Sequence, residues 1–113
     1  MKKLGYEGIG EVVVTAAMSG EMERGIPVCL EGSGAVRPCG AGEVFCGIAQ
    51  GGRGGWGAVQ VKGFVSVACS GALNVGWAEV AADGEGGVCQ SEGGLKVLVM
   101  QTDPEGKRAV ICL

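Results

Sequence analysis

Six cysteines are the residues of this chain with the widest capacity for chemistry: Cys29, Cys39, Cys46, Cys69, Cys89 and Cys112. No two of them have the C-x₂₋₄-C spacing of a zinc site, and the sequence has no histidine to complete one. Most stand within strand-like segments, and no secretory signal is evident. We therefore expect reduced, mostly buried thiols that act as small apolar residues. Disulfide pairing is the open alternative.

Acid–base chemistry has few candidates in this sequence. The absence of histidine removes imidazole as a base, and a cysteine nucleophile would need another activating group. Glu79 and Asp83 could pair as acid and base, but both fall at predicted strand ends or turns, where solvated carboxylates are normal. We expect no catalytic site, no cofactor and no metal, so the sequence favours a protein that is not an enzyme.

A glycine-rich segment, "GGRGGWG" at residues 51–57, superficially resembles a phosphate-binding loop. Such a loop leads into a helix and ends in Lys-Ser or Lys-Thr, whereas this one leads into a predicted strand. We interpret it as a flexible surface loop. Its Arg53 and Trp56 are candidates for contact with a partner protein, because arginine and tryptophan are enriched among binding hot spots.

Length and charge set broad limits on function. The chain has 113 residues, which suits one domain, and its 12 acidic and 9 basic residues are interspersed. No basic stripe suggests nucleic-acid binding, and no apolar stretch approaches the roughly 20 residues that span a bilayer. Glu7 and Glu11 interrupt the segment that a signal peptide would need to be apolar. We expect a protein made in the cytoplasm that binds neither nucleic acid nor membrane.

The elements that position these residues are predicted to be short strands. The sequence combines 24 glycines with 47% hydrophobic residues, and turn signals recur about every 6–12 residues. The fold class is therefore all-β: a compact antiparallel β-barrel or sandwich of about nine short strands. Residues 1–8 are predicted to be a flexible N-terminal arm, and residues 9–113 a single β domain. "DGEGG" at 83–87 is the strongest turn signal.

The longest strand-like run is "AVQVKGFVSVACSG", residues 58–71, in which valines alternate with mostly polar residues. Phe64 lies on its polar face. Phe45 and Trp77 are predicted to be in the core, whereas Tyr6, Trp56 and Phe64 lack an obvious place in it. A second layer of the same domain could bury Phe64, but the scarcity of aromatic residues favours burial against a neighbouring chain.

Three segments carry a family resemblance: "GIPVCLEGSGAVRPCGAGEVFCGIAQ", "AVQVKGFVSVACSGALNVGWAEVAADGEGGV" and "LVMQTDPEGKRAVICL". In the order of their strands and glycine turns they resemble small tailed-phage head decoration proteins, also called capsid cement proteins. The resemblance covers roughly residues 25–113. It implies a compact β fold that binds the outside of an assembled phage or prophage head, commonly as a trimer. No catalytic residues carry over from it.

The resulting hypothesis is a non-enzymatic decoration protein on the capsid exterior of a virion assembled in the bacterial cytoplasm. Its expected partners are the major capsid protein and two further copies of itself in a homotrimer. The predicted interface residues are Leu4, Tyr6, Arg53, Trp56 and Phe64. The alternative is a free-standing β-barrel binding module for a small molecule or carbohydrate, with Trp56 and Trp77 lining its pocket.

Overall fold

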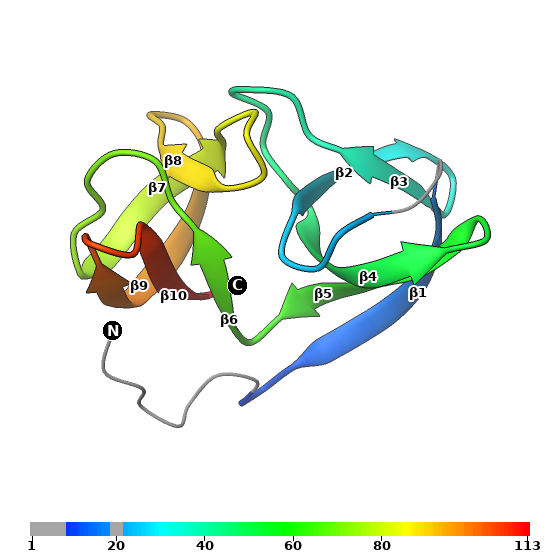
Figure 1. The fold of residues 1–113 in the computed structure, drawn as a ribbon, viewed down its shortest axis with the longest axis horizontal. Coiled ribbons are helices and arrows are strands. Elements are labelled where there is room, and N and C mark those ends of the chain that lie inside the picture. Colours follow the sequence, from blue (N-terminus) through cyan, green and yellow to red (C-terminus); the bar gives the residue numbers. More distant parts are fainter. Residues whose placement is uncertain (1–8, 19–21) are drawn as a thin grey trace.

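The computed structural model describes residues 9–18 and 22–113, and these residues form an all-β fold (Figure 1). No helix long and apolar enough to cross a membrane occurs in these residues. The described residues form ten strands: β1 (Val12–Met18), β2 (Pro27–Gly32), β3 (Ala35–Pro38), β4 (Gly47–Arg53), β5 (Trp56–Lys62), β6 (Phe64–Ala68), β7 (Gly76–Ala82), β8 (Val88–Gln90), β9 (Leu95–Asp103) and β10 (Arg108–Cys112). The predicted fold class is confirmed, with one strand more than the expected nine.

The first five strands close into a small barrel with the strand order β1-β3-β2-β4-β5. All its pairs are antiparallel except β1 with β3, which pair in parallel through two residues at the end of β1. The inward-facing residues of β1 are Ala16 and Met18, which pack against buried aliphatic side chains of β2 to β5. The barrel therefore has its own apolar core.

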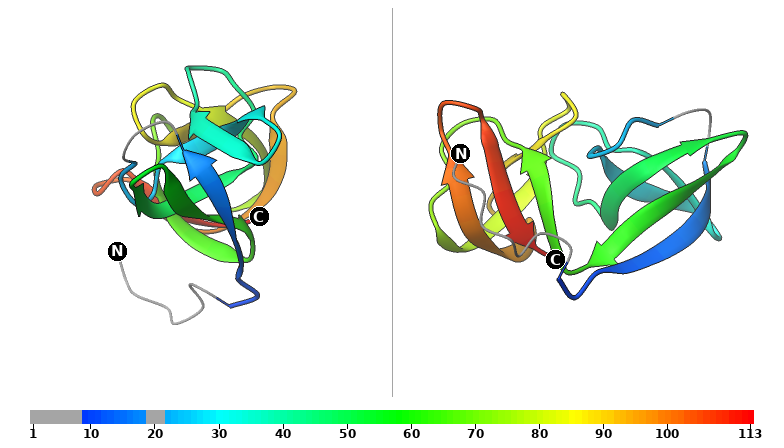
Figure 2. Two further views of the ribbon diagram at one scale, coloured as in Figure 1. Left: turned by 90° about the vertical axis from the view of Figure 1, so that its right-hand side faces the viewer. Right: turned by 60° about the horizontal axis from the view of Figure 1, so that its bottom comes forward.

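The other five strands form a second sheet with the order β6-β10-β9-β7-β8. The sheet curls until its two edge strands meet at a single parallel bridge between Cys69 and Val88. Its core contains valines of β6, β7, β8 and β9 together with Ala109 and Ile111 of β10, and it also takes in Phe45 and Ile48 from the barrel side. Figure 2 shows the resulting two lobes side by side. Phe45 is 2% exposed, so its predicted place in the core is confirmed.

The long run at 58–71 contains two strands rather than one. It breaks at Gly63, where β5 of the barrel ends and β6 of the second sheet begins. Gly63 has φ of +97°, and a Cβ at this position would lie 2.7 Å from the backbone of Gly10 and Glu11. Only glycine fits this crossing. The prediction of an unbroken strand was wrong because the valine alternation continues in phase across the break.

Gln60 fixes the junction between the lobes from the barrel side. Its side chain is 1% exposed, and its Nε2 donates to the carbonyl oxygens of Lys62 and Phe64, both at 3.1 Å. Its Oε1 accepts a hydrogen bond of 2.7 Å from Gln50 Nε2. A buried amide with these partners hydrogen-bonds the backbone on both sides of the Gly63 crossing.

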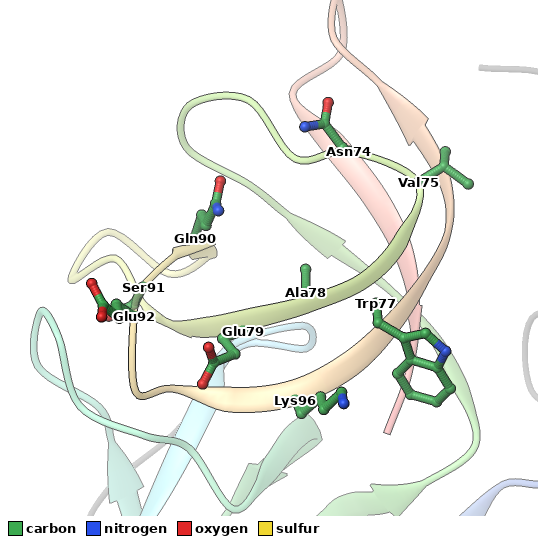
Figure 3. A pocket seen from close by; sticks show the side chains of 9 residues that line it. All are labelled: Asn74, Val75, Trp77, Ala78, Glu79, Gln90, Ser91, Glu92 and Lys96. Carbon is green, nitrogen blue, oxygen red and sulfur yellow. The ribbon is translucent and has the colours of Figure 1, made fainter.

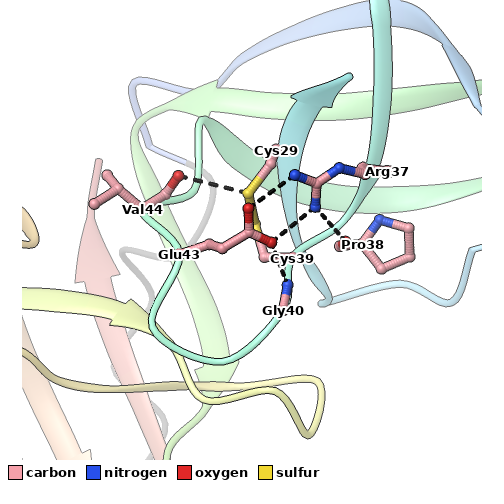
Figure 4. The surroundings of a disulfide bond; sticks show 7 residues. All are labelled: Cys29, Arg37, Pro38, Cys39, Gly40, Glu43 and Val44. Carbon is pink, nitrogen blue, oxygen red and sulfur yellow. Dashed lines mark hydrogen bonds and ion pairs between the residues drawn. A yellow bond between two sulfur atoms is a disulfide. The ribbon is translucent and has the colours of Figure 1, made fainter.

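The loop between β3 and β4 is held at its start and in its middle (Figure 4). A disulfide joins Cys29 of β2 to Cys39, and Arg37 makes a bidentate ion pair with Glu43, both bonds at 2.8 Å. The Arg37 hydrogen bond, with one from the Gly40 amide, lowers the pKa of Glu43 to about 2. The loop then contacts the second lobe through backbone hydrogen bonds of its residues 42 and 43 with Ala82.

This disulfide corrects the expectation of six reduced thiols. Cys29 sits opposite Arg37 in the β2–β3 pair, so the hairpin brings it beside Cys39. The other four cysteines are free, and the expected burial holds only for Cys69 among them. Cys46 is exposed, and partial desolvation of its thiol raises its pKa. Sequence alone could not place the pair, because the pairing depends on the register of the hairpin.

Candidate protein-interaction surface

The first half of β1 is an open strand edge, because no strand among the described residues covers its outer side. Val12 to Ala16 pair with β5 on one side, but β3 reaches only Ala17 and Met18 on the other. Val12, Val13 and Val14 are 48%, 40% and 44% exposed. Soluble proteins usually protect such an edge with a lysine, a proline or a bulge. The register of β1 against β5 shifts between Val12 and Val13, but β1 has no charged residue or proline between its ends. An exposed edge of three valines is typical of a surface that another chain covers.

The hydrogen-bonding direction of this edge follows from its neighbours. The Ala17 amide donates to Gly34 on the β3 side, whereas the Met18 amide donates to Gly55 on the β5 side. Backbone groups alternate in direction along a strand, so Val13 and Thr15 present their N–H and C=O groups to the open side. Two residues with free backbone groups, flanked by valine side chains, can accept an added strand.

The hairpin between β4 and β5 places Arg53 and Trp56 directly opposite one another in its last pair. Its two-residue turn is Gly54-Gly55, both with positive φ, as a tight hairpin turn requires. Trp56 is 62% exposed and lies beside Ala17 of β1, on the same outer face as Val13. The segment expected to be a flexible loop is therefore a hairpin tip, and it presents Trp56 next to the β1 edge.

The outer face of the second sheet carries an apolar row. Phe64 pairs with Cys112, Cys112 with Leu98, and Leu98 with Trp77, so the four side chains cross β6, β10, β9 and β7 in one line. Phe64, Leu98 and Cys112 are half-buried, whereas Trp77 is 69% exposed. The prediction that Trp77 belongs to the core is wrong, because its neighbours Ala78 and Val80 face inward and place Trp77 outward.

A groove of about 750 Å³ lies beside Trp77 (Figure 3). It is lined by Asn74, Val75, Trp77, Ala78, Glu79, Gln90, Ser91, Glu92 and Lys96. The Lys96 Nζ stands 5.7 Å from the Trp77 ring centroid, within the range of a cation–π contact. Trp56 does not line this groove, so the alternative prediction of a single pocket with both tryptophans is wrong.

The acidic pair considered for catalysis is divided between two surroundings. The Asp83 carboxylate accepts hydrogen bonds from Ser70 Oγ at 2.5 Å and from the amides of Glu85 and Gly87, so it closes the predicted 83–87 turn. Burial acts to raise the Asp83 pKa, but these hydrogen bonds outweigh it and lower the pKa. Glu79 lies instead on the exposed face of β7. Within residues 9–18 and 22–113, no group of three acidic, cysteine or histidine side chains could hold a metal.

The structure brings some of the predicted interface residues together and separates others. Arg53 and Trp56 share the hairpin tip, whereas Phe64 lies at the junction of the lobes and lines a cleft of about 430 Å³ with Gln60 and Arg108. Leu4 and Tyr6 lie outside the described residues. The interface prediction therefore corresponds to two places on the described surface, the barrel hairpin and the lobe junction.

Sequence reasoning missed the valine edge of β1 and the exposure of Trp77, and it also missed exposed Leu30, Val44 and Val75. The sequence had one signal for this edge. In "VVVT" both the odd-numbered and the even-numbered positions are apolar, although a barrel strand needs only one apolar face. The exposure of Trp77 also had a signal: Trp77 and Glu79 are two residues apart, so their side chains point to the same face of a strand. A comparison with protein-family models finds no match, and a comparison with curated protein sequences finds no similar protein.

Proposed function

We propose that this protein is a phage or prophage capsid decoration protein, without enzymatic activity, that binds the outer surface of the assembled head as a homotrimer. The observation that carries the proposal furthest is the open valine edge of β1 beside exposed Trp56. In a small monomer an uncovered edge of this kind is only a liability, whereas a protein that coats a larger assembly can use it as a contact surface. The resemblance of its strand and turn pattern to decoration proteins supplies the kind of assembly.

The proposed mechanism is addition of contact area across neighbouring capsid subunits. Burial of apolar surface contributes roughly 25 cal/mol per Å² before the costs of association are subtracted. Trp56 and the β1 edge form a continuous outer face of the barrel, so one partner can cover both. Leu4 and Tyr6 remain part of the proposed interface, as does Phe64. The proposed location is the capsid exterior, with assembly in the bacterial cytoplasm.

The test uses heads assembled from the major capsid protein of the phage or prophage that encodes this chain. Purified protein is mixed with the heads, and bound protein is measured after sedimentation. Val13→Pro removes an outward N–H without touching the β1–β5 ladder, and Val13→Thr is its matched control because it keeps that N–H. We expect Val13→Pro and Trp56→Ala each to weaken binding at least tenfold, as loss of a hot-spot contact does.

Two results would count against different parts of the proposal. If the unaltered protein does not sediment with the heads, the decoration function is wrong. If it does, but Val13→Pro, Trp56→Ala and deletion of residues 1–8 all bind as well as the unaltered protein, the function stands and the interface is wrong. Light scattering coupled to size-exclusion chromatography tests the trimer separately, with a mass near three times 11.3 kDa expected.

One observation favours the second candidate function, a free-standing module that binds a small molecule or carbohydrate. The groove beside Trp77 has an exposed aromatic ring with the amides of Asn74 and Gln90 nearby, which is a combination that can bind a sugar ring. This function predicts a monomer whose tryptophan fluorescence changes when an oligosaccharide is added. A trimer that binds heads and gives no such change favours decoration.

A further inference from the structure

The second lobe also has an open strand edge, on β7. β8 pairs with β7 only through Val80, Ala81 and Ala82, so no strand among the described residues lies on that side of the first half of β7. The turn after β8 ends the coverage, with the Gly94 amide donating to the Ser91 carbonyl before β9 begins on the opposite side of β7. The groove shown in Figure 3 lies along this uncovered half.

The direction of the β7 backbone groups is fixed by four hydrogen bonds. Ser91 N–H donates to the Glu79 carbonyl on the β8 side, and Asp83 N–H donates to Gly87 on the same side. Ala82 instead bonds to the loop residues 42 and 43 on the other side. The backbone N–H and C=O groups of the odd-numbered residues of β7 therefore point toward β8. Those of Trp77 point into the groove, because β8 does not extend that far.

The two faces of this edge can both pack against an added strand. Ala78 faces inward and packs against the core of the second sheet, and its small side chain leaves room beside it. Trp77 faces outward and is 69% exposed. An incoming strand would therefore place alternate side chains next to the core and next to the indole ring, as strand addition requires.

The charged side chains of the groove indicate which kind of strand could bind to the β7 edge. The ionic groups that line the groove are the carboxylates of Glu79 and Glu92 and the ammonium of Lys96, which is held near the Trp77 ring. Pairing of this edge with the same edge of a second copy would bring the carboxylates of both copies together. A lysine or arginine side chain that lies opposite Glu79 would instead gain a favourable cross-strand pair.

We propose that the open half of β7 binds an extended, basic peptide segment of a partner protein by β-strand addition. This inference rests on the geometry of β7 and goes beyond the proposed binding to heads. The β1 edge belongs to the barrel and the β7 edge to the second sheet, so one molecule has a docking edge in each lobe. It can then join two partner segments rather than coat one.

The test uses purified protein without heads, so it does not depend on whether the chain decorates a capsid. Trp56→Phe leaves Trp77 as the sole tryptophan and reporter. The probe is the blocked peptide acetyl-Lys-Val-Lys-Val-Thr-Val-Lys-amide, with the glutamate-for-lysine peptide as charge control. A third peptide carries N-methyl groups on the internal lysine and the threonine, whose N–H groups would face β7. Binding is followed by Trp77 fluorescence and by amide shifts in ¹⁵N NMR spectra.

We expect the lysine peptide to bind with amide shifts centred on β7 residues 76–79 and to lose at least tenfold in affinity on N-methylation. Glu92→Lys should weaken binding at least threefold, whereas Glu105→Lys, an equivalent exposed turn substitution at the far end of β9, should not. The proposal is overturned if the peptide does not bind at millimolar concentration, or if the N-methylated or glutamate peptide binds equally well. It is also overturned if maltotetraose rather than peptide perturbs Trp77, or if the edge self-associates on concentration.

Discussion

Removal of the Cys29–Cys39 disulfide gives the most quantitative prediction about this fold. The bond joins Cys29 of β2 to Cys39, the residue after β3, and closes a loop with a sequence separation of 10 residues. The chain-entropy relation assigns about 9 cal/mol/K to a closed loop of this size, which is about 2.7 kcal/mol at 25 °C. A domain of 113 residues unfolds with an entropy of about 240 cal/mol/K, so the same change lowers Tm by about 11 °C.

The assay is urea unfolding of the Cys29→Ser/Cys39→Ser protein followed by circular dichroism. The matched control is Cys89→Ser/Cys112→Ser, which alters two half-buried free thiols without opening a loop. We expect the first pair to lose about 2.7 kcal/mol and the control to lose less than about 1 kcal/mol. Unaltered protein treated with a reducing agent should match the first pair. A reduced protein as stable as the oxidised one would refute the reasoning.

The disulfide also bears on the proposed assembly of the protein in the bacterial cytoplasm. The bacterial cytoplasm keeps thiols reduced, so a chain that assembles there carries Cys29 and Cys39 as a dithiol. The Arg37–Glu43 ion pair and the backbone bonds of the loop to Ala82 can still hold the loop in that state. We expect alkylation and mass spectrometry to find the pair reduced inside cells and oxidised in released particles. A pair that stays reduced in released particles would contradict this order of events.

Three smaller predictions concern the junction and the loop. Gly63→Val should destabilise the fold by about 3 kcal/mol or more in urea unfolding, whereas Gly32→Ala, where a Cβ meets nothing within 4 Å, should cost about 1 kcal/mol or less. Gln60→Leu leaves two backbone carbonyls without their donor and should cost about 1–3 kcal/mol. Because the Glu43 pKa falls from 4.5 to about 2, its ion pair with Arg37 should be complete above pH 4.5 and lost as the pH falls through 2; a ¹³C carboxyl titration with a midpoint near 4.5 would contradict this.

The fold class was predictable because it depends on local patterns. Valine alternation and glycine turns occur within each strand or hairpin, and Asp83 caps its predicted turn with its own carboxylate. The division into two lobes was not predictable from the same signal. The alternation around Gly63 keeps its phase on both sides, so nothing in the period reports that the strand changes sheets. The only local mark is a glycine, and the sequence has 24 of them.

The candidate surface was predictable where it depends on residue type and not where it depends on strand pairing. Arg53 and Trp56 were identified by their chemistry, and the structure places both at an exposed hairpin tip. The β1 edge arises because β3 pairs with only the last two residues of β1. That pairing is long-range and parallel, and single-sequence patterns do not report it. The three exposed valines therefore resembled an ordinary buried strand.

The lobe junction decides whether the two proposed docking edges can act as one brace. A bridge between two partners resists their separation only if its own lobes keep a fixed relation. Here Gln60 bonds to the backbone on both sides of the Gly63 crossing, and the 39–46 loop bonds to Ala82 of the second sheet. These contacts couple the lobes at two separate places. If the protein decorates heads as proposed, Gln60→Leu should weaken bracing of the shell more than it weakens binding to it. Heads coated with this variant should then rupture at a lower temperature than heads coated to the same density with the unaltered protein. Equal rupture temperatures would mean that the lobes need not be coupled, and that each edge acts alone.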